Sequence, residues 1–160
     1  LDCVVRLYPQ QALLEILTAD TPPQKDNNTT PIYFDRGFPL VPVMVDGRGP
    51  LLMRLDTGAP APALSRAHLQ ELHLQAEGSL INSEHRFDFA GMGITMPQVP
   101  AYPFTDGDLH HYGIIGTHGL PPVIEIRAGK GYLSYPTALL LPPEPGARKP
   151  QGKTRAKPRP

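Results

Sequence analysis

The residues best suited to chemistry in this sequence are Asp56, Thr57, Gly58 and Ala59, which directly follow the apolar run 51–55. An acid at the end of a buried strand is held rigidly, a neighbouring hydroxyl can hydrogen-bond locally, and a glycine lets the backbone approach closely. An acid held in this way is suited to exchanging a proton with a reactant. The alternative is a turn in which Asp56 only caps a loop, and the tetrapeptide alone does not exclude it.

A second group of residues has metal-ligand chemistry: Asp106, Asp108, His110, His111 and His118. Adjacent histidines project in different directions from a strand or a loop, so this spacing lacks the geometry of a known zinc motif. The pattern favours a polar loop, and we expect no metal site. A metal-binding module that uses these histidines is the alternative.

Other catalytic patterns are not recognisable in the sequence. The segment Gly91-Met92-Gly93 lacks the further glycines, the lysine and the hydroxyl residue of a phosphate-binding loop, so no nucleotide cofactor is expected. No Ser/His/Asp or Cys/His arrangement can be identified from spacing, because the fold brings such groups together from distant positions.

Short strands and turns are expected to position Asp56. Twenty-one prolines, fifteen glycines and the absence of tryptophan disfavour a helical bundle, which makes the fold class mainly β. A strand over residues 39–45, a tight turn over 46–49 and a strand over 51–55 form a predicted hairpin, and Asp56 stands at its end.

Further elements are predicted after Asp56. Ser65 is suited to cap a helix over residues 65–74, in which Leu69 and Leu72 stand three positions apart. More strands are predicted over residues 87–99, 101–104 and 112–115, and a second hairpin joins 123–126 to 132–135 through a turn at 128–131.

The two ends of the chain differ from its middle. Residues 4–19 are compatible with a short helix or an edge strand, and the proline-rich, polar residues 20–30 are typical of a linker. Residues 142–160 contain six basic residues and almost nothing apolar, which predicts a disordered tail; an electrostatic tether to an anionic surface is the alternative. We therefore expect one domain over 37–141, preceded by an extension and linker over 1–36.

Composition excludes several classes of protein. Fifteen basic residues balance fifteen acidic ones, so the charge indicates no nucleic-acid partner. Cys3 is the only cysteine, which excludes an intramolecular disulfide and a cysteine-based zinc site. No segment approaches the roughly 20 apolar residues of a membrane span. The compartment stays open, although Leu1-Asp2-Cys3 is loosely similar to a lipoprotein cleavage site and favours an exported or periplasmic protein.

Several segments resemble the retropepsin-like aspartic proteases, in particular the bacterial members related to retroviral proteases. Residues 41–49 are similar to the first strand of the family and its turn. Residues 55–59, followed by Leu64-Ser65, are similar to its signature. Residues 112–116 resemble its element of two hydrophobic residues and a glycine, and 123–135 resemble its closing strands. The order and separations of these segments agree with the family.

This resemblance implies a single-lobe, closed β-barrel of the pepsin/retropepsin acid-protease type with one or two short helices. It also implies one catalytic carboxylate, an active-site loop and a supporting motif: Asp56; Thr57, Gly58 and Ala59; and Ile114, Ile115 and Gly116. The second carboxylate comes from another copy of the chain. The expected function is therefore that of a homodimeric aspartic endopeptidase acting on peptide or protein substrates without a cofactor.

Two of the sequence's departures from the family concern the active-site region. Pro60 stands where a serine or threonine usually follows the signature. Only residues 75–86 are available for the glycine-rich flap that closes over substrate in the family, unless residues 87–95 take that place. These departures favour an alternative: a retropepsin-like domain that has lost catalysis and serves as a dimerisation or peptide-binding module.

Overall fold

A computed structural model describes residues 3–23, 27–103, 111–116, 118 and 120–136. Its elements are short strands and three-residue 3-10 turns, so the predicted mainly β class is confirmed. In chain order they are β1 (Cys3–Tyr8), η1 (Pro9–Gln11), β2 (Leu13–Thr18), β3 (Asn27–Pro31), β4 (Tyr33–Asp35), β5 (Phe38–Val45), β6 (Arg48–Leu55), β7 (Ala63–Ser65), η2 (Arg66–His68), β8 (Leu80–Ile81), β9 (His85–Phe89), β10 (Met92–Met96), β11 (Val99–Tyr102), β12 (Gly113–Ile115), β13 (Ile124–Arg127), η4 (Ala128–Lys130) and β14 (Tyr132–Pro136).

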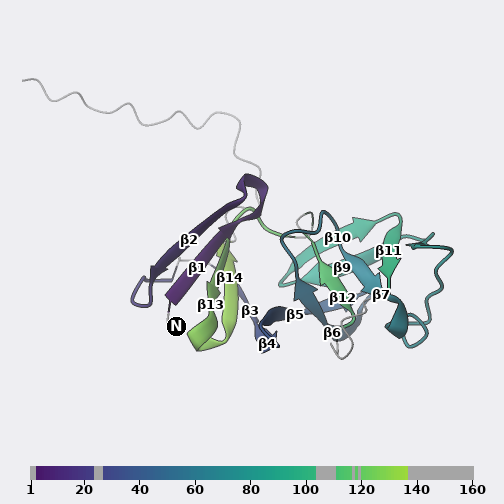
Figure 1. Ribbon diagram of the computed structural model, residues 1–160, viewed down its shortest axis with the longest axis horizontal. Helices are drawn as coiled ribbons and strands as arrows, with labels where there is room; N and C mark the ends of the chain where they lie inside the picture. The colour runs from purple at the N-terminus through teal and green to yellow at the C-terminus, as the bar shows by residue number, and fades with distance from the viewer. Residues whose placement is uncertain (1–2, 24–26, 104–110, 117, 119, 137–160) are drawn as a thin grey trace, which may run out of the picture.

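The strands form two sheets, which Figure 1 shows side by side. The smaller sheet has the order β2-β1-β13-β14-β3, and the larger has the order β10-β9-β5-β6-β12-β7-β11-β8 with β4 beside β5. Among the described strands the larger sheet runs from β10 to β8 without pairing back on itself. The expected closed barrel is therefore not found, and the larger sheet is open.

The predicted hairpin is confirmed as β5–β6, which lies inside the larger sheet. Asp46 and Gly47 both have positive φ, 51° and 74°, which is the backbone geometry of a tight hairpin turn. Alternate residues of β5 and β6 point into the core, and Val41, Val43 and Met53 are fully buried there. Each such side chain contributes roughly 1.5–3 kcal/mol through burial. The core thus fixes the direction in which β6 delivers Asp56.

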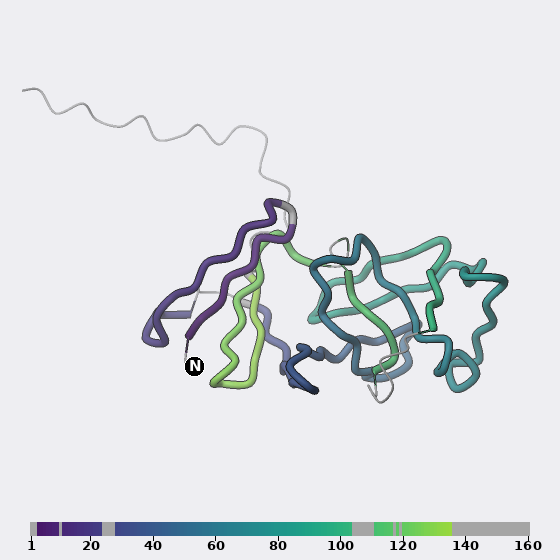
Figure 2. The backbone as a smooth tube through the Cα atoms, in the orientation of Figure 1, coloured from purple at the N-terminus to yellow at the C-terminus, as the bar shows by residue number. Residues whose placement is uncertain are grey.

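Both ends of the described chain contribute to the smaller sheet. Figure 2 shows the purple N-terminal hairpin beside the green C-terminal one, and β1 pairs with β13 while β3 pairs with β14. The segment over residues 4–19 is thus a strand hairpin rather than a helix. The expected linker over 20–30 is wrong for Asn27–Thr30, which belong to β3, because polar residues can pair through their backbone where β14 offers an edge.

The second predicted hairpin is confirmed as β13–β14, in which Gly131 supplies a φ of 69°. It lies in the smaller sheet, away from the strands around Asp56. The predicted tail over 142–160 lies outside the described residues.

The predicted helix over residues 65–74 is wrong. Ser65 is extended with ψ of 127° and makes no side-chain cap hydrogen bond, because β7 pairs it with Tyr102 of β11. Only η2 follows, and His73 has a φ of 57°, which a helix does not accommodate. Leu69 and Leu72 are nevertheless buried, so both leucines pack into the core without being on a helix.

Candidate active site

Asp56 lies where strand β6 ends and the chain turns away from the larger sheet. Its backbone N–H donates to the carbonyl of Ile115 at 3.1 Å, and Ala59 N–H donates back to the Asp56 carbonyl at 3.3 Å. The N–H of Gly58 donates to carboxylate Oδ1 at 2.9 Å. These contacts fix the carboxylate at the start of a tight turn, with 30% of the side chain exposed.

Strand β12 lies between β6 and β7, parallel to the first and antiparallel to the second. The loop 56–62, which connects β6 to β7, therefore has to pass over the end of β12. Ile115 is opposite Leu55, and Ile114 is opposite Ala63. The predicted supporting residues are thus brought against the Asp56 loop by pairing on both sides.

Two glycines permit this close crossing. A Cβ on Gly113 would lie 2.1 Å from the carbonyl oxygen of Ala63, and one on Gly116 would lie 2.6 Å from that of Ala61. Neither distance is compatible with a side chain, because the atoms met are backbone. Gly116, predicted from its motif, is required by the contact between β12 and the loop.

Arg54 is a site residue that sequence reasoning missed. Its Nη2 lies 3.2 Å from Asp56 Oδ2, and its guanidinium lies 5.0 Å from the ring centroid of Phe38. The signal was available, because residues two apart on a strand share one face. One carboxylate oxygen therefore receives an N–H of Gly58, and the other faces a cation.

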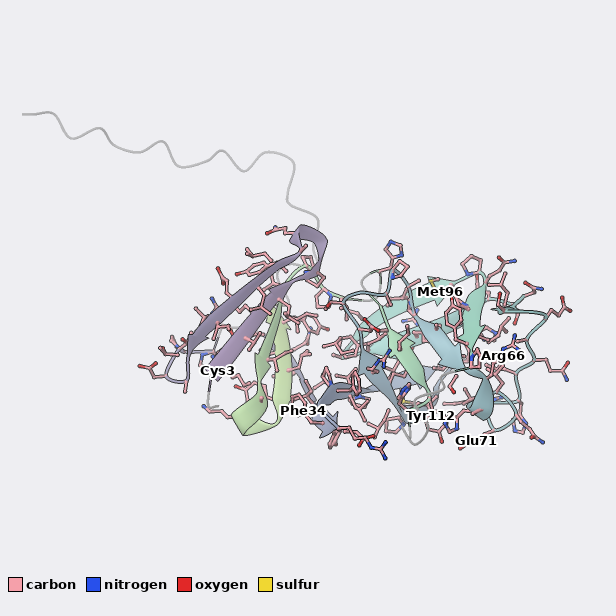
Figure 3. All side chains as sticks on the ribbon, viewed as in Figure 1. Cys3, Phe34, Arg66, Glu71, Met96 and Tyr112 are labelled. Carbon is pink, nitrogen blue, oxygen red and sulfur yellow. The ribbon has the colours of Figure 1, made fainter. Side chains whose placement is uncertain are left out.

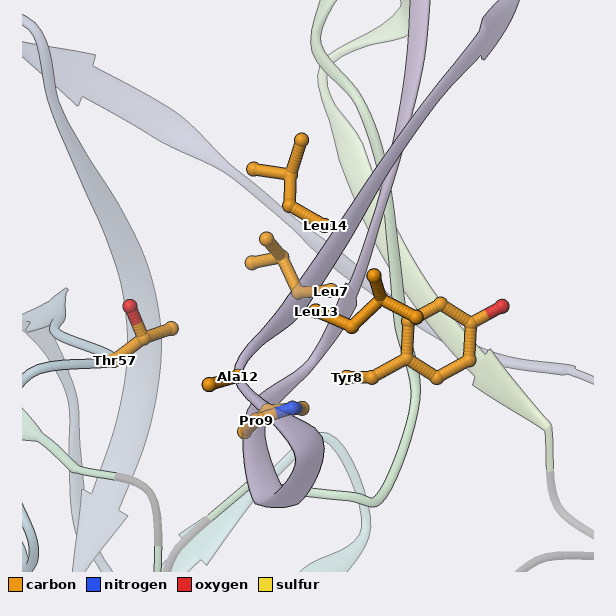
Figure 4. A pocket seen from close by; sticks show the side chains of 7 residues that line it. All are labelled: Leu7, Tyr8, Pro9, Ala12, Leu13, Leu14 and Thr57. Carbon is orange, nitrogen blue, oxygen red and sulfur yellow. The ribbon is translucent and has the colours of Figure 1, made fainter.

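Thr57 faces the N-terminal hairpin (Figure 4). With that hairpin it lines a pocket of about 260 Å³, shown in Figure 4. The hairpin residues that line it are mostly apolar: Leu7, Tyr8, Pro9, Ala12, Leu13 and Leu14. Leu13 and Leu14 are 48% and 54% exposed. An apolar hollow thus adjoins the residue next to Asp56.

The remaining loop residues have structural contacts. The carbonyl of Pro60 accepts a hydrogen bond from the N–H of His118 at 3.0 Å, so the backbone at this departure from serine or threonine still has a partner.

The two regions considered for the flap both belong to the larger sheet. Residues 75–86 contain β8, which pairs with β11, and 87–95 lie in the hairpin β9–β10, which pairs with β5. Phe87 and Phe89 of that hairpin are fully buried, so it is part of the sheet.

Tyr112, which directly precedes β12, contacts Glu71, and Figure 3 labels both residues. The hydroxyl of Tyr112 donates to Glu71 Oε1 at 2.6 Å, and this hydrogen bond raises the pKa of the tyrosine. The Tyr112 N–H also donates to the carbonyl of Leu52 at 2.9 Å. The segment after η2 is thereby tied to the strand that supports the Asp56 loop.

The residues with metal-ligand chemistry were expected to form a polar loop, and only two of them are described. His111 is 2% exposed and His118 is exposed, whereas Asp106, Asp108 and His110 lie outside the described residues. Within the described part of the chain, no three His, Cys, Asp or Glu side chains lie close enough together to hold a metal ion.

A Ser/His/Asp arrangement that spacing could not reveal is present at the other end of β6. Ser83 Oγ lies 2.7 Å from His85 Nε2, and His85 Nδ1 lies 2.6 Å from Asp46 Oδ2. Asp46 is 39 residues from His85 in sequence, and pairing of β9 with β5 brings them together.

Comparisons with protein-family models, with curated proteins and with solved structures found no match to this chain. Among the described residues, no helix has both the length and the apolar character needed to span a membrane.

Proposed function

We propose that this protein is an aspartic endopeptidase in which two copies of Asp56, one from each chain of a homodimer, activate a water molecule. The observation that carries the proposal is the loop 56–62, which presents the Asp56 carboxylate at the end of β6 and passes over β12. Its resemblance to the retropepsin-like signature supports the same assignment. The larger sheet, although open, is proposed to be the single lobe of an acid protease.

The proposed mechanism follows from placing two carboxylates in one site. Two carboxyl groups about 3 Å apart cannot both ionise comfortably, so they share one proton. The ionised carboxylate takes a proton from water, which attacks the peptide carbonyl, while the protonated one polarises the carbonyl oxygen. Their roles reverse as the tetrahedral intermediate releases the amine. The Gly58 N–H keeps each carboxylate oriented by holding Oδ1.

The second copy is proposed to bind against the pocket beside Thr57. Because Thr57 adjoins Asp56, a partner that brings its own Asp56 to the two-fold axis also approaches this apolar hollow. Half-exposed Leu13 and Leu14 would lose water on contact, which favours association. The pocket and the catalytic loop then form one continuous interface.

One observation favours the alternative of an inactive dimerisation or peptide-binding module. Arg54 faces Asp56 Oδ2 at 3.2 Å, the same carboxylate that would have to share a proton with its partner. This ion pair occupies the carboxylate oxygen that the carboxyl group of a second copy would have to approach. In the active dimer, Arg54 would have to release Oδ2 while its guanidinium stays over the ring of Phe38.

The deciding experiment incubates the purified full chain with a mixed peptide library at acidic pH. Cleavage that a statine-type transition-state mimic inhibits is expected. In Asp56→Asn, activity should fall at least about 100-fold, because the amide cannot exchange the proton, while circular dichroism stays unchanged. A dimer that binds peptides without cleaving them would instead support the inactive module, and near wild-type activity in Asp56→Asn would exclude the mechanism.

A further inference from the structure

The hydrogen-bonded side chains of Ser83, His85 and Asp46 have the order and contacts of a nucleophile, a base and an orienting acid. An ionised carboxylate only accepts hydrogen bonds, so the 2.6 Å contact with Asp46 Oδ2 places the imidazole proton on Nδ1. In the neutral imidazole His85 Nε2 is then an acceptor, and the hydroxyl of Ser83, 2.7 Å away, is the group placed to donate to it. The base is therefore already positioned to take the proton of the serine.

Asp46 is held firmly enough to orient the imidazole. The N–H of Arg86 donates to Asp46 Oδ1 at 2.8 Å, and the N–H of Asp46 donates to the Arg86 carbonyl at the same distance. Partial burial raises the pKa of Asp46, but the hydrogen bonds from Arg86 and His85 outweigh it, so the pKa is lowered. The carboxylate stays ionised and can stabilise an imidazolium.

Exposure differs between the base and the nucleophile. His85 is 6% exposed at the start of β9, whereas Ser83 is exposed. A small molecule can therefore reach the hydroxyl while the imidazole is held in place. The three hydrogen-bonded residues lie at the opposite end of the eight-residue strand β6 from Asp56, roughly 25 Å away. They are therefore independent of the proposed protease site.

We propose that Ser83 is an activated nucleophile that accepts the acyl group of small activated esters and returns it to water. Oγ attacks the ester carbonyl carbon as its proton moves to His85 Nε2. The C–O bond to the alcohol then breaks, and the alcohol leaves with that proton. Water, deprotonated by Nε2, next attacks the acyl-serine, releasing a carboxylic acid and restoring the hydroxyl. Ester and water thus give acid and alcohol.

The first test uses the full chain with p-nitrophenyl acetate and with an alkyl fluorophosphonate. We expect a covalent phosphonyl adduct on Ser83 by mass spectrometry and hydrolysis above the buffer rate. Ser83→Ala should lower hydrolysis to the rate in buffer alone. Ser79→Ala removes another exposed serine hydroxyl four residues away and should hydrolyse the ester at the wild-type rate. Asp56→Asn should also keep it, which separates this activity from the peptidase.

The second test asks whether Asp46 acts as a positioning residue. In Asp46→Asn the amide oxygen can still accept from Arg86, and the NH₂ group then faces His85 Nδ1. We expect the imidazole proton to move to Nε2, visible in the ¹⁵N chemical shifts of His85, and hydrolysis to fall at least tenfold. Absence of an adduct on wild-type Ser83, or hydrolysis unaffected by Ser83→Ala, overturns the proposal.

Discussion

The larger sheet holds the candidate site through close backbone approach, whereas the smaller sheet joins the two ends of the described chain around buried charges. Around Asp56, glycines at 113 and 116 let β12 contact the loop 56–62. In the smaller sheet, Glu125 of β13 contacts Arg127 at 2.7 Å and Arg6 of β1 at 3.0 Å. The larger sheet needs positions without a side chain, so that two backbone segments can touch. The smaller sheet needs every member of its buried ion pairs.

The largest expected effect comes from breaking the buried charges. Glu125 and Arg127 are 1% and 3% exposed, so Glu125→Gln leaves a guanidinium buried without its carboxylate. We expect a loss of about 3–5 kcal/mol in unfolding free energy. Asp88→Asn is the matched control, because solvent screens its pair with Arg86 and the loss should be far smaller. Equal losses in urea denaturation would show that burial of the pair does not decide the outcome.

A smaller effect is expected in the larger sheet, from adding one methyl group where two backbone segments meet. Gly116→Ala places a Cβ against the Ala61 backbone, which should cost about 1–3 kcal/mol and displace the loop that carries Asp56. Peptidase activity should fall more than stability. In the control Gly93→Ala, the Cβ meets the movable end of Arg86, so thermal unfolding should change little. An unaltered melting temperature in Gly116→Ala would contradict the close crossing.

The same contrast explains what could be predicted from the sequence. The hairpins β5–β6 and β13–β14 were predictable, because Asp46-Gly47 and Gly131 supply positive φ beside apolar runs. The pairing of β1 with β13 was not, since it joins residues about 120 positions apart and β2 lacks a buried face. At the site, Asp56 and Gly116 stood in recognisable motifs. Arg54 could have been found, because it stands two positions before Asp56. The contact between His85 and Asp46 joins residues 39 positions apart, which spacing does not report.

The proposed dimer would connect the two sheets, since its interface includes the pocket between Thr57 and the N-terminal hairpin. Leu14→Asp places a charge where a second copy would bury leucine, so we expect the dimer dissociation constant to rise at least tenfold, or about 1.4 kcal/mol. Leu14 is 54% exposed, which should leave the fold intact. Phe34→Asp, at a residue 52% exposed in β4, is the control. Analytical ultracentrifugation that shows equal shifts in both variants would place the interface elsewhere.

The smallest expected effect is a pH dependence at the β5–β6 turn. Hydrogen bonds from Arg86 and His85 outweigh partial burial and lower the pKa of Asp46 in the folded chain. A carboxyl group whose pKa is lowered by folding contributes stability that is present above its unfolded pKa, about 3.9, and lost as the pH falls through the folded value. Asp46→Asn keeps a residue that tolerates the positive φ but has no such titration.

We therefore expect wild type to exceed Asp46→Asn in unfolding free energy near neutral pH, and the difference to shrink below about pH 4. Because the other carboxyl groups are common to both proteins, the difference between the two urea-denaturation curves isolates Asp46. The effect should be modest, since the Asp46 side chain is 40% exposed and solvent screens its interactions. A difference that stays constant from neutral to strongly acidic pH would mean that Asp46 stabilises the turn through its backbone conformation and not through its charge.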